Sequence, residues 1–274
     1  MKIVSQGTDR GGVFNEDAIG ASANAVWVVD GATSLGPSRM AGTSDAAWFA
    51  HQVSRSLSHA TGDAQARLSA AITEARDIYA ALGPLPAEPW AMPSAGVAIV
   101  REDGDHLEIA SLGDVRVWVV AADGEVVRLP GGEALEAFDT AALERLMAIR
   151  AEQGPIPLKA ARLQLDPMLR ETRAKMNRES GYWVLSLDAG CLAGLQVTRL
   201  PLRDVQFVLM ATDGFYDLWG IYDVPLEEVL NGLADGQGEA FLEHLRDTER
   251  ADPEGLRYPR FKAHDDASWM MIQV

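Results

Sequence analysis

The sequence predicts an α+β fold in which two antiparallel β-sheets pack together and helices flank them. Short apolar segments separated by only a few turn residues recur along the chain, and this spacing is typical of antiparallel strands and not of βαβ units. Two segments with helical periodicity, residues 44–57 and 63–82, interrupt the strands early. Hairpin-built sheets with helices on their outer faces belong to the α+β class.

The elements expected before residue 130 follow from apolar periodicity and from capping and breaking residues. Thr43 or Ser44 is a suitable N-cap for the first helix, and Gly83-Pro84 ends the second. In order, we expect strands at 1–5 and 25–29, helices at 44–57 and 63–82, strands joined as hairpins at 94–100, 106–111 and 115–120, and an edge strand at 126–129.

Residues 130–180 differ from the rest of the chain. Glu133 to Glu152 form an amphipathic helical pattern, the Gly-Pro-Ile-Pro stretch at 154–157 breaks it, and a charged helical segment continues to about Arg178. Fifty residues with so few aromatic side chains would make a poor independent core. We therefore expect one domain over residues 1–274, with a helical insertion at about 130–180 that lies over the core.

Strands resume after the insertion. In the second half of the chain, one apolar run precedes the Asp-Gly pair at 213–214, and another follows the Asp-Asp pair at 265–266. The expected elements are strands at 182–187, 195–200, 205–211 and 267–274, short helices at 225–230 and 239–247, and an ordered polar loop at 250–264.

Composition excludes several classes of protein. The chain has a net charge of −16 from 24 basic and 40 acidic residues, which argues against nucleic acid and against an anionic membrane surface as partners. Cys191 is the single cysteine, so there is no internal disulfide and no Cys-rich zinc site, and Val197 stands where a Cys-x5-Arg phosphatase loop would need arginine. No signal-peptide pattern or membrane-length apolar run of about 18 residues occurs, so we expect a cytoplasmic protein.

Acidic residues mark the ends of several predicted strands. Each Asp-Gly pair alone is also explained by a turn, because these residues are common in turns. Several carboxylates delivered to one sheet end repel one another unless cations neutralise them. Oxygen ligands without His or Cys partners select Mg²⁺ or Mn²⁺ over Zn²⁺. The clusters are Asn15-Glu16-Asp17, Asp30-Gly31, Gly113-Asp114, Asp213-Gly214 with Asp217, and Asp265-Asp266.

These clusters, taken in order, resemble the metal-dependent protein phosphatases of type 2C, bacterial members included. The likeness spans residues 7–274, apart from about 130–180, and implies a four-layer sandwich of two antiparallel β-sheets flanked by α-helices. The segments that carry it are Asn15-Glu16-Asp17-Ala18, Val29-Asp30-Gly31, Ser94-Ala95-Gly96, Leu112-Gly113-Asp114, Ala211-Thr212-Asp213-Gly214-Phe215-Tyr216-Asp217 and Asp265-Asp266-Ala267-Ser268.

The resemblance also implies a ligand set for two Mg²⁺ or Mn²⁺ ions, with a third, weaker site. Asp30 corresponds to the ligand that bridges both ions, and the Gly31 carbonyl to a ligand of one of them. Asp213 and Asp265 are implied as direct ligands, and with Asp30 they form the catalytic set. Glu16 and Asp17 are implied as ligands through water. Asp114 and Asp217 are implied at the third site, where an ordinary role in a turn or at a helix start is the alternative.

The chain departs from the family pattern at the phosphate-binding arginine. That residue usually stands four positions before the Glu of the Glu-Asp pair, and here the position is Gly12. Arg10 is the nearby candidate for substrate binding, with a surface ion pair as the alternative. The basic run Arg257, Arg260 and Lys262 either balances the acidic cluster or contacts phosphate. The histidines show no ligand spacing, although His264 adjoins a predicted ligand and is a candidate general acid.

The resemblance implies an enzyme. It would be a Mg²⁺- or Mn²⁺-dependent serine/threonine phosphoprotein phosphatase that hydrolyses phosphomonoesters by direct attack of a water bridging two ions. Two alternatives stay open: a non-catalytic regulatory or phosphoprotein-binding module with the same fold, which Gly12 favours, and a small-molecule phosphoesterase. The intact acid set favours the enzyme. The insertion is expected near the metal end, where it would govern access of protein substrates.

Overall fold

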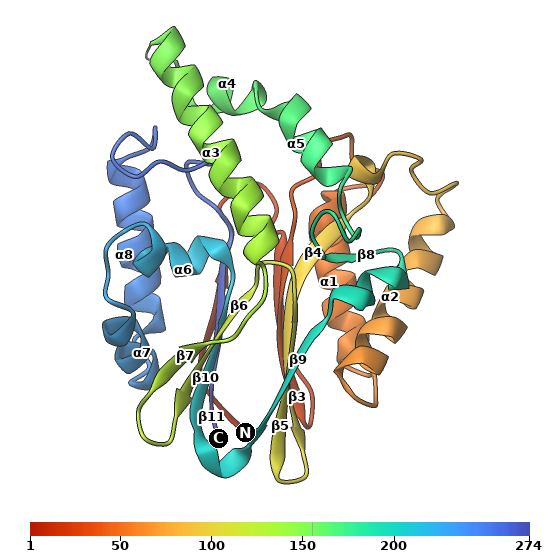
Figure 1. The fold of residues 1–274 in the computed structure, drawn as a ribbon, viewed down its shortest axis with the longest axis vertical. Coiled ribbons are helices and arrows are strands. Elements are labelled where there is room, and N and C mark those ends of the chain that lie inside the picture. Colours follow the sequence, from red (N-terminus) through yellow and green to blue (C-terminus); the bar gives the residue numbers. More distant parts are fainter. Residues whose placement is uncertain (155) are drawn as a thin grey trace.

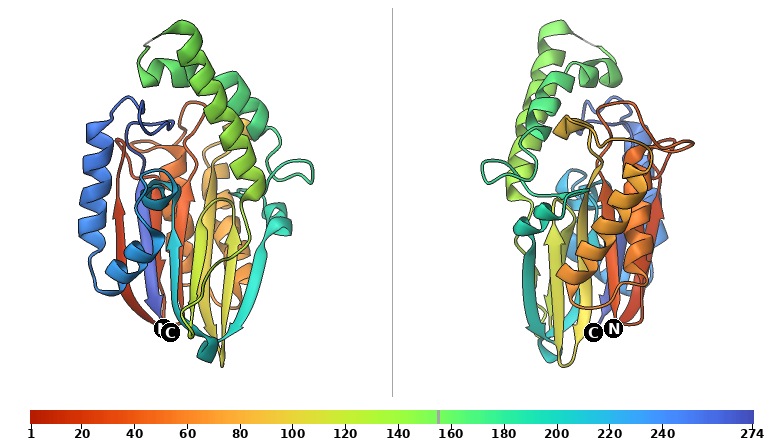
Figure 2. Two further views of the ribbon diagram at one scale, coloured as in Figure 1. Left: turned by 60° about the vertical axis from the view of Figure 1, so that its left-hand side comes forward. Right: turned by 90° about the vertical axis from the view of Figure 1, so that its right-hand side faces the viewer.

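The computed structural model describes residues 1–154 and 156–274. Two antiparallel β-sheets pack face to face, helices cover both outer faces, and three further helices lie across one end (Figures 1 and 2). The predicted α+β sandwich is therefore confirmed. Both chain termini lie at the end of the sandwich opposite these three helices (Figure 1).

All strand pairs within the two sheets are antiparallel. The first sheet has the order β1 (Lys2–Asp9), β11 (Ala267–Gln273), β10 (Val205–Ala211), β6 (Arg116–Ala121) and β7 (Val126–Arg128). The second has the order β2 (Asp17–Ala21), β3 (Ala25–Gly31), β4 (Ser94–Asp103), β5 (His106–Leu112) and β9 (Gln196–Pro201), with β8 (Leu185–Ser186) paired to β4.

Helices form the outer layers. The second sheet is covered by α1 (Asp45–Leu57) and α2 (Ala64–Ala80), and the first by α6 (Asp213–Gly220), α7 (Leu226–Ala234) and α8 (Gly238–Ala251) (Figure 1). The predicted N-cap of α1 is confirmed, since Ser44 Oγ accepts from the Ala47 amide. The N-cap of α2 is Asp63, whose Oδ1 accepts from the Ala66 amide. Short 3₁₀ turns lie at Pro89–Ala91, Ala189–Gly194 and Leu202–Asp204.

The apolar residues sort into layers by strand alternation, because successive side chains of a strand point to opposite faces. In β3, Val26 and Val28 lie between the two sheets, whereas Trp27 and Val29 pack outward under α1 and α2. Met210 and Met270 fill the centre from the facing sheet. The first sheet buries its other face, including Trp269, under α6, α7 and α8.

The segment predicted to be an insertion, which keeps that name below, comprises α3 (Glu133–Gln153), α4 (Leu158–Leu163) and α5 (Asp166–Arg173). The helix α3 ends where Gly154 adopts a left-handed φ of 78°. Pro155, part of the predicted helix break, lies outside the described residues. Leu146 and Ile149 of α3 form a small apolar cluster with α4 and the start of α5. Within the described residues, no helix is long and apolar enough to cross a membrane.

One predicted hairpin is wrong. The strands at 106–112 and 116–121 follow each other closely, but β5 pairs with β4 and β9, whereas β6 pairs with β10 and β7 in the other sheet. Gly113, with a left-handed φ of 89°, turns the chain between the two sheets. The short spacing is thus a crossing between sheets, and it delivers Asp114 to the end of the sandwich where the sheets meet.

Candidate metal and phosphate site

Strand register brings the predicted site residues to one end of each sheet. In the second sheet, Asp17 at the start of β2 lies opposite Asp30 at the end of β3, and Asp30 lies opposite Gly96 near the start of β4. In the first sheet, Ala211 at the end of β10 lies opposite Arg116 at the start of β6. Because both sheets are antiparallel, the ends of some strands and the starts of others meet at this edge.

A hydrogen bond joins the two sheets at this edge. Thr212 Oγ1, just after β10, donates to Asp17 Oδ2 of the other sheet at 2.9 Å, and the same hydroxyl accepts from the Ser268 amide. Thr212, Asp17 and Ser268 are all buried. Asp17 of the second sheet is therefore held beside the segment of the first sheet that leads into Asp213.

Asp213 begins α6, whereas the sequence suggested only a tight turn there. Thr212 adopts the extended backbone of an N-cap residue, and Asp213 Oδ1 accepts from the Gly214 amide at 2.7 Å. A carboxylate in the first turn of a helix is stabilised by the helix dipole. The second acid of this segment, Asp217, lies one turn further along α6.

The carboxylates of the cluster act strongly on one another. Burial raises the pKa of Asp213 well above its ordinary value, and the charges of Asp265 and Asp114 raise it further. Burial likewise raises the pKa of Asp17 to about 7 and that of Asp217 to about 8. The pKa of Asp30 is raised well above its ordinary value by burial, then by the charges of Asp17, Asp213, Asp114 and Asp265.

This donor set fits hard divalent cations. It consists of carboxylate and carbonyl oxygens, the ligands that Mg²⁺ and Mn²⁺ prefer. In the described part of the chain, no group of three or more Asp, Glu, His or Cys side chains forms a ready-made metal site. Suitable ligands and the lack of a ready-made site among the described residues are compatible, because carboxylates repel one another and approach coordination distance only around a cation.

Two glycines make room for this arrangement. A Cβ atom on Gly31 would collide with the carbonyl oxygen of Glu16, to which the Gly31 amide donates at 2.9 Å. A Cβ atom on Gly96 would collide with a carboxylate oxygen of Asp114. A side chain at Gly31 would therefore displace the backbone of Glu16, and one at Gly96 would displace the Asp114 carboxylate. The Glu16 carboxylate itself is held by the hydroxyls of Thr33 and Ser44.

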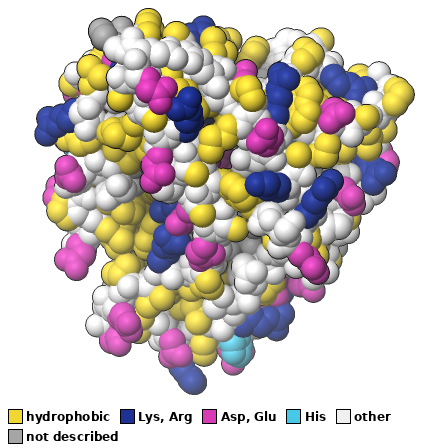
Figure 3. Space-filling view, turned by 45° about the horizontal axis from the view of Figure 1, so that its top comes forward, with side chains coloured by type: hydrophobic (Ala, Val, Ile, Leu, Met, Phe, Trp, Pro, Cys, Tyr) yellow, Lys and Arg dark blue, Asp and Glu magenta, His cyan; other side chains and the backbone are white. Residues whose placement is uncertain are grey.

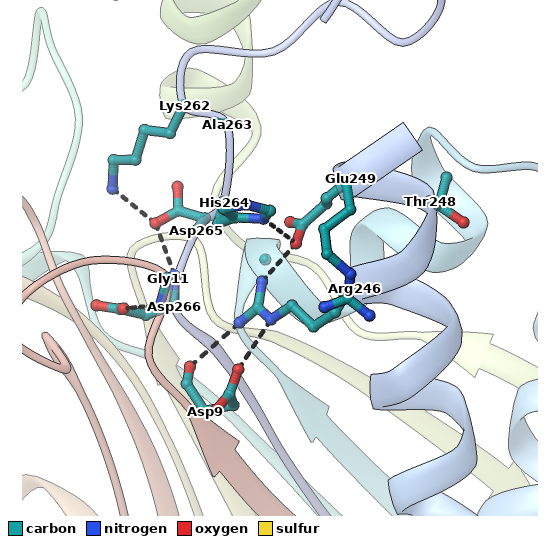
Figure 4. Close-up of polar contacts among 12 residues, drawn as sticks. Asp9, Gly11, Arg246, Thr248, Glu249, Lys262, Ala263, His264, Asp265 and Asp266 are labelled. Atoms are coloured by element: carbon teal, nitrogen blue, oxygen red, sulfur yellow. Dashed lines mark hydrogen bonds and ion pairs between the residues drawn. The ribbon is translucent and has the colours of Figure 1, made fainter. Parts of the chain in front are cut away.

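The two adjacent acids before β11 have different surroundings (Figure 4). Asp266 accepts from the Gly11 amide and the Glu16 amide at 2.6 Å each, so it fastens both ends of the 11–16 loop. Asp265 accepts from Lys262 Nζ at 2.6 Å and is only partly buried. Asp266 is thus bonded to backbone amides. The charge of Asp265, in contrast, raises the pKa of Asp213 and of Asp217.

The basic run before β11 divides into structural and site-facing residues. Arg260 is buried and donates to the Asp252 carboxylate and to the Tyr258 carbonyl. Arg257 stacks on the Tyr258 ring. Lys262, paired with Asp265, faces the cluster, and the negative charges of Asp265, Asp213 and Glu16 act to raise its pKa.

Two other candidates from the sequence lie at the edge of the site. Arg10 is exposed, and its side chain donates to the Val13 carbonyl at 3.4 Å. His264 Nδ1 lies 2.8 Å from Glu249, on the far side of Asp265 from Lys262 (Figure 4). The role of Arg10 in substrate binding stays a prediction.

The insertion crosses this end of the sandwich (Figure 1) and contacts the start of β6 on one side and the loop after β3 on the other. Glu136 of α3 pairs with Arg116 at 2.7 Å. At its other end, Arg170 and Arg173 of α5 donate to the carbonyls of Leu35 and Thr33, in the loop after β3. Figure 3 views the molecule with this end turned forward, and basic side chains lie among acidic ones across it.

Sequence reasoning missed the arginines of the insertion. Arg173 donates to the carbonyl of Thr33, which lies 140 positions earlier in the chain. No local pattern marks such a contact, since α5 is a short charged helix like many surface helices. The available signal was indirect: a site for phosphate needs a cationic side chain, and position 12 does not provide one.

A two-sheet sandwich that gathers carboxylates from both sheets at one end defines a class of metal-dependent phosphatases. A family model for protein phosphatase 2C matches residues 7–254. The chain therefore belongs to the protein phosphatase 2C family, whose members are metal-dependent serine/threonine phosphatases. Among curated proteins, none matches this chain in sequence.

Solved structures show the same fold at low sequence identity. The catalytic domain of the serine/threonine protein phosphatase PstP, in complex with two manganese ions, is 18% identical with a TM-score of 0.54, covering 97% of this chain and 95% of that one. Stp1 from Staphylococcus aureus is 16% identical (TM-score 0.54; 98% and 93% covered). MsPP from Mycobacterium smegmatis, in complex with cacodylate, is 15% identical (TM-score 0.52; 98% and 97% covered).

Proposed function

We propose that this protein hydrolyses phosphoserine or phosphothreonine in proteins with two bound Mg²⁺ or Mn²⁺ ions. The observation that carries the proposal is the gathering of mutually repelling carboxylates, buried or half-buried, from both sheets at one end of the sandwich. Such a cluster is stable as a set of anions only with cations beside it. When bound, the pair of ions supplies a nucleophilic water and charge for the phosphoryl oxygens.

The chain's own residues divide the work of holding the ions. In the proposal, Asp30, the Gly31 carbonyl, Asp213 and Asp265 would hold the two ions directly, with Asp30 serving both. Glu16 and Asp17 would act through water, and Asp114 and Asp217 would serve a third, weaker site. Support comes from the strand register that aligns Asp17 with Asp30, and from Asp266, whose bonds to two backbone amides leave Asp265 for the metal.

The experiment is hydrolysis of an aryl phosphate with and without Mn²⁺, followed by a panel of phosphoserine, phosphothreonine and phosphotyrosine peptides. The proposal expects activity only with Mn²⁺ or Mg²⁺, and a preference for phosphoserine or phosphothreonine. Hydrolysis of a small phosphoester with no activity on peptides would favour a small-molecule phosphoesterase.

A non-catalytic role in binding phosphoproteins is the second candidate. Gly12 and the exposed position of Arg10 favour it, because neither gives the site an arginine where the family has one. Under this alternative, Mn²⁺ and phosphopeptides bind, but no phosphate is released. The same peptide panel, read by calorimetry for binding and by phosphate release for turnover, separates the two functions.

A further inference from the structure

We propose that Arg173, at the end of α5, binds the phosphoryl group of the substrate and fills the role left open by Gly12. The proposal rests on the proposed function above and adds a substrate-binding residue to the same site. It also assigns part of that site to the insertion, which the sequence suggested would control access alone.

The first argument is the position of Arg173. Its Nη2 atom donates to the Thr33 carbonyl at 2.7 Å, two residues beyond Gly31 in the chain. The Thr33 hydroxyl in turn donates to the Glu16 carboxylate. Arg173 and Glu16 therefore meet at one residue of the loop that follows β3, so the guanidinium lies beside the acid cluster.

The second argument is that the guanidinium has donors to spare. In the part of the chain that the structure describes, its one side-chain hydrogen bond is the bond to Thr33, and no carboxylate forms a salt bridge with it. Arg173 is only partly buried, so a ligand can reach it. An arginine fork with free N–H groups beside a phosphate site matches the geometry of a phosphoryl group.

The third argument is that the other basic side chains near the cluster are already paired with a carboxylate or stacked on an aromatic ring. Arg116 pairs with Glu136 and stacks on the Tyr216 ring, and Arg170 stacks on the Trp90 ring while donating to Leu35. Arg257, Arg260 and Lys262 have the partners described above.

Electrostatics agree with this placement. Burial raises the pKa of the Asp114 carboxyl, and the positive charges of Arg116 and Arg173 oppose that rise. The positive charge of Arg173 therefore acts on Asp114, which lies just before β6. A substrate phosphate carries a double negative charge into a cluster of acids, so a cation in this position favours its binding in addition to the metal ions.

The test is binding of inorganic phosphate to the Mn²⁺-loaded full-length protein, measured by calorimetry. We expect Arg173→Ala to weaken phosphate binding about ten- to a hundredfold, the usual size of a charge-assisted bond. The phosphate affinity of Arg173→Lys, which keeps the charge but not the planar fork of donors, should lie between those of wild type and Arg173→Ala. Binding of Mn²⁺ itself should change little, since Arg173 is not a ligand.

Arg170→Ala is the matched control, because Arg170 lies on the same helix and docks on the same loop through Leu35. It should leave phosphate affinity within about twofold of wild type. If Arg170→Ala and Arg173→Ala weaken phosphate binding equally, Arg173 acts only by docking α5, and the proposal is overturned. It is also overturned if Arg10→Ala weakens binding and Arg173→Ala does not, or if the wild-type protein binds no phosphate.

A gain-of-function variant completes the test. A Cβ atom at Gly12 would have open space, with the Phe14 carbonyl oxygen 3.9 Å away as its nearest neighbour. Gly12→Arg in the Arg173→Ala background should restore phosphate affinity at least in part. A wild-type protein that binds phosphate but releases none from phosphopeptides would overturn the proposed function, while the Arg173 comparison would still be decided by affinity.

Discussion

Asp213 and Asp30 are the residues on which the proposed metal site depends most directly. Asp213 lies in the first turn of α6, and its pKa is raised by burial and by the charges of Asp265 and Asp114. A neutral side chain here removes one charge and one ligand oxygen from the proposed metal site while keeping its shape. The effect on metal binding should therefore be large and the effect on folding small.

We expect Asp213→Asn to abolish aryl phosphate hydrolysis, to at most about a thousandth of wild type, because the loss of an electrostatic partner in a water-excluded site commonly costs that much. Mn²⁺ binding by calorimetry should weaken in parallel. Asp235→Asn, an exposed change of the same chemistry after α7, is the control. Undiminished turnover in Asp213→Asn would end the metal assignment.

Protons and metal ions should compete for the same carboxylates. With the pKa of Asp17 raised to about 7 and that of Asp217 to about 8, both acids hold protons in the metal-free protein at pH 6. A cation favours the charged form, so metal binding expels these protons, and affinity rises as pH rises.

We therefore expect Mn²⁺ affinity to increase from pH 6 to pH 8, by up to about tenfold per pH unit for each proton released. Calorimetry at pH 7 in two buffers of different ionisation enthalpy counts the protons directly. Enthalpies that do not depend on the buffer would show that the acids are already charged, contrary to this expectation.

The elements differ in how far the sequence alone could predict them. The apolar runs that became β3, β10 and β11 could be predicted because buried strands need continuous apolar residues, and the acids beside them marked the site. The crossing at Gly113 could not, since spacing between strands does not say which sheet each joins. The docking of α5 through Arg170 and Arg173 could not either, because it depends on tertiary contacts between distant segments.

The insertion has its own small core, distinct from the layers of the sandwich. Leu146 is 2% exposed and packs with Ile149, Leu158 and Leu165, whereas the adjacent Met147 is 51% exposed. A unit with few buried contacts opens at lower free energy than the sheets it covers. The insertion should therefore be able to unfold locally while the two sheets stay folded.

We expect Leu146→Ala to destabilise the insertion by about 2–5 kcal/mol, the usual cost of such a cavity. Hydrogen exchange should then accelerate in α3 and α5 while β10 stays protected. Met147→Ala, one residue along the same helix, should leave both regions unchanged. Equal loss of protection in β10 would mean that the insertion and the sandwich unfold as one unit.

At the scale of the whole molecule, the proposed metal site joins the two sheets. Asp30 and Asp17 belong to the second sheet, and Asp213 and Asp265 lie at strand ends of the first. Without a cation, the repulsion among these acids acts across the interface between the sheets. Metal binding replaces that repulsion with shared ligands, so it should stabilise the sandwich as a unit and not one sheet alone.

Mn²⁺ should therefore raise the melting temperature of the whole protein. A ligand at 100 times its dissociation constant stabilises the folded state by about 2.7 kcal/mol. For a chain of this size that corresponds to a rise of about 5–10 °C. Circular dichroism and near-UV fluorescence should report the same shift, because sheets and core melt together. Asp30→Asn removes the ligand that would serve both ions, so its melting temperature should no longer respond to Mn²⁺. A full response in that variant would mean that the stabilising ion binds elsewhere, and that the two sheets are held together without a shared metal ligand at Asp30.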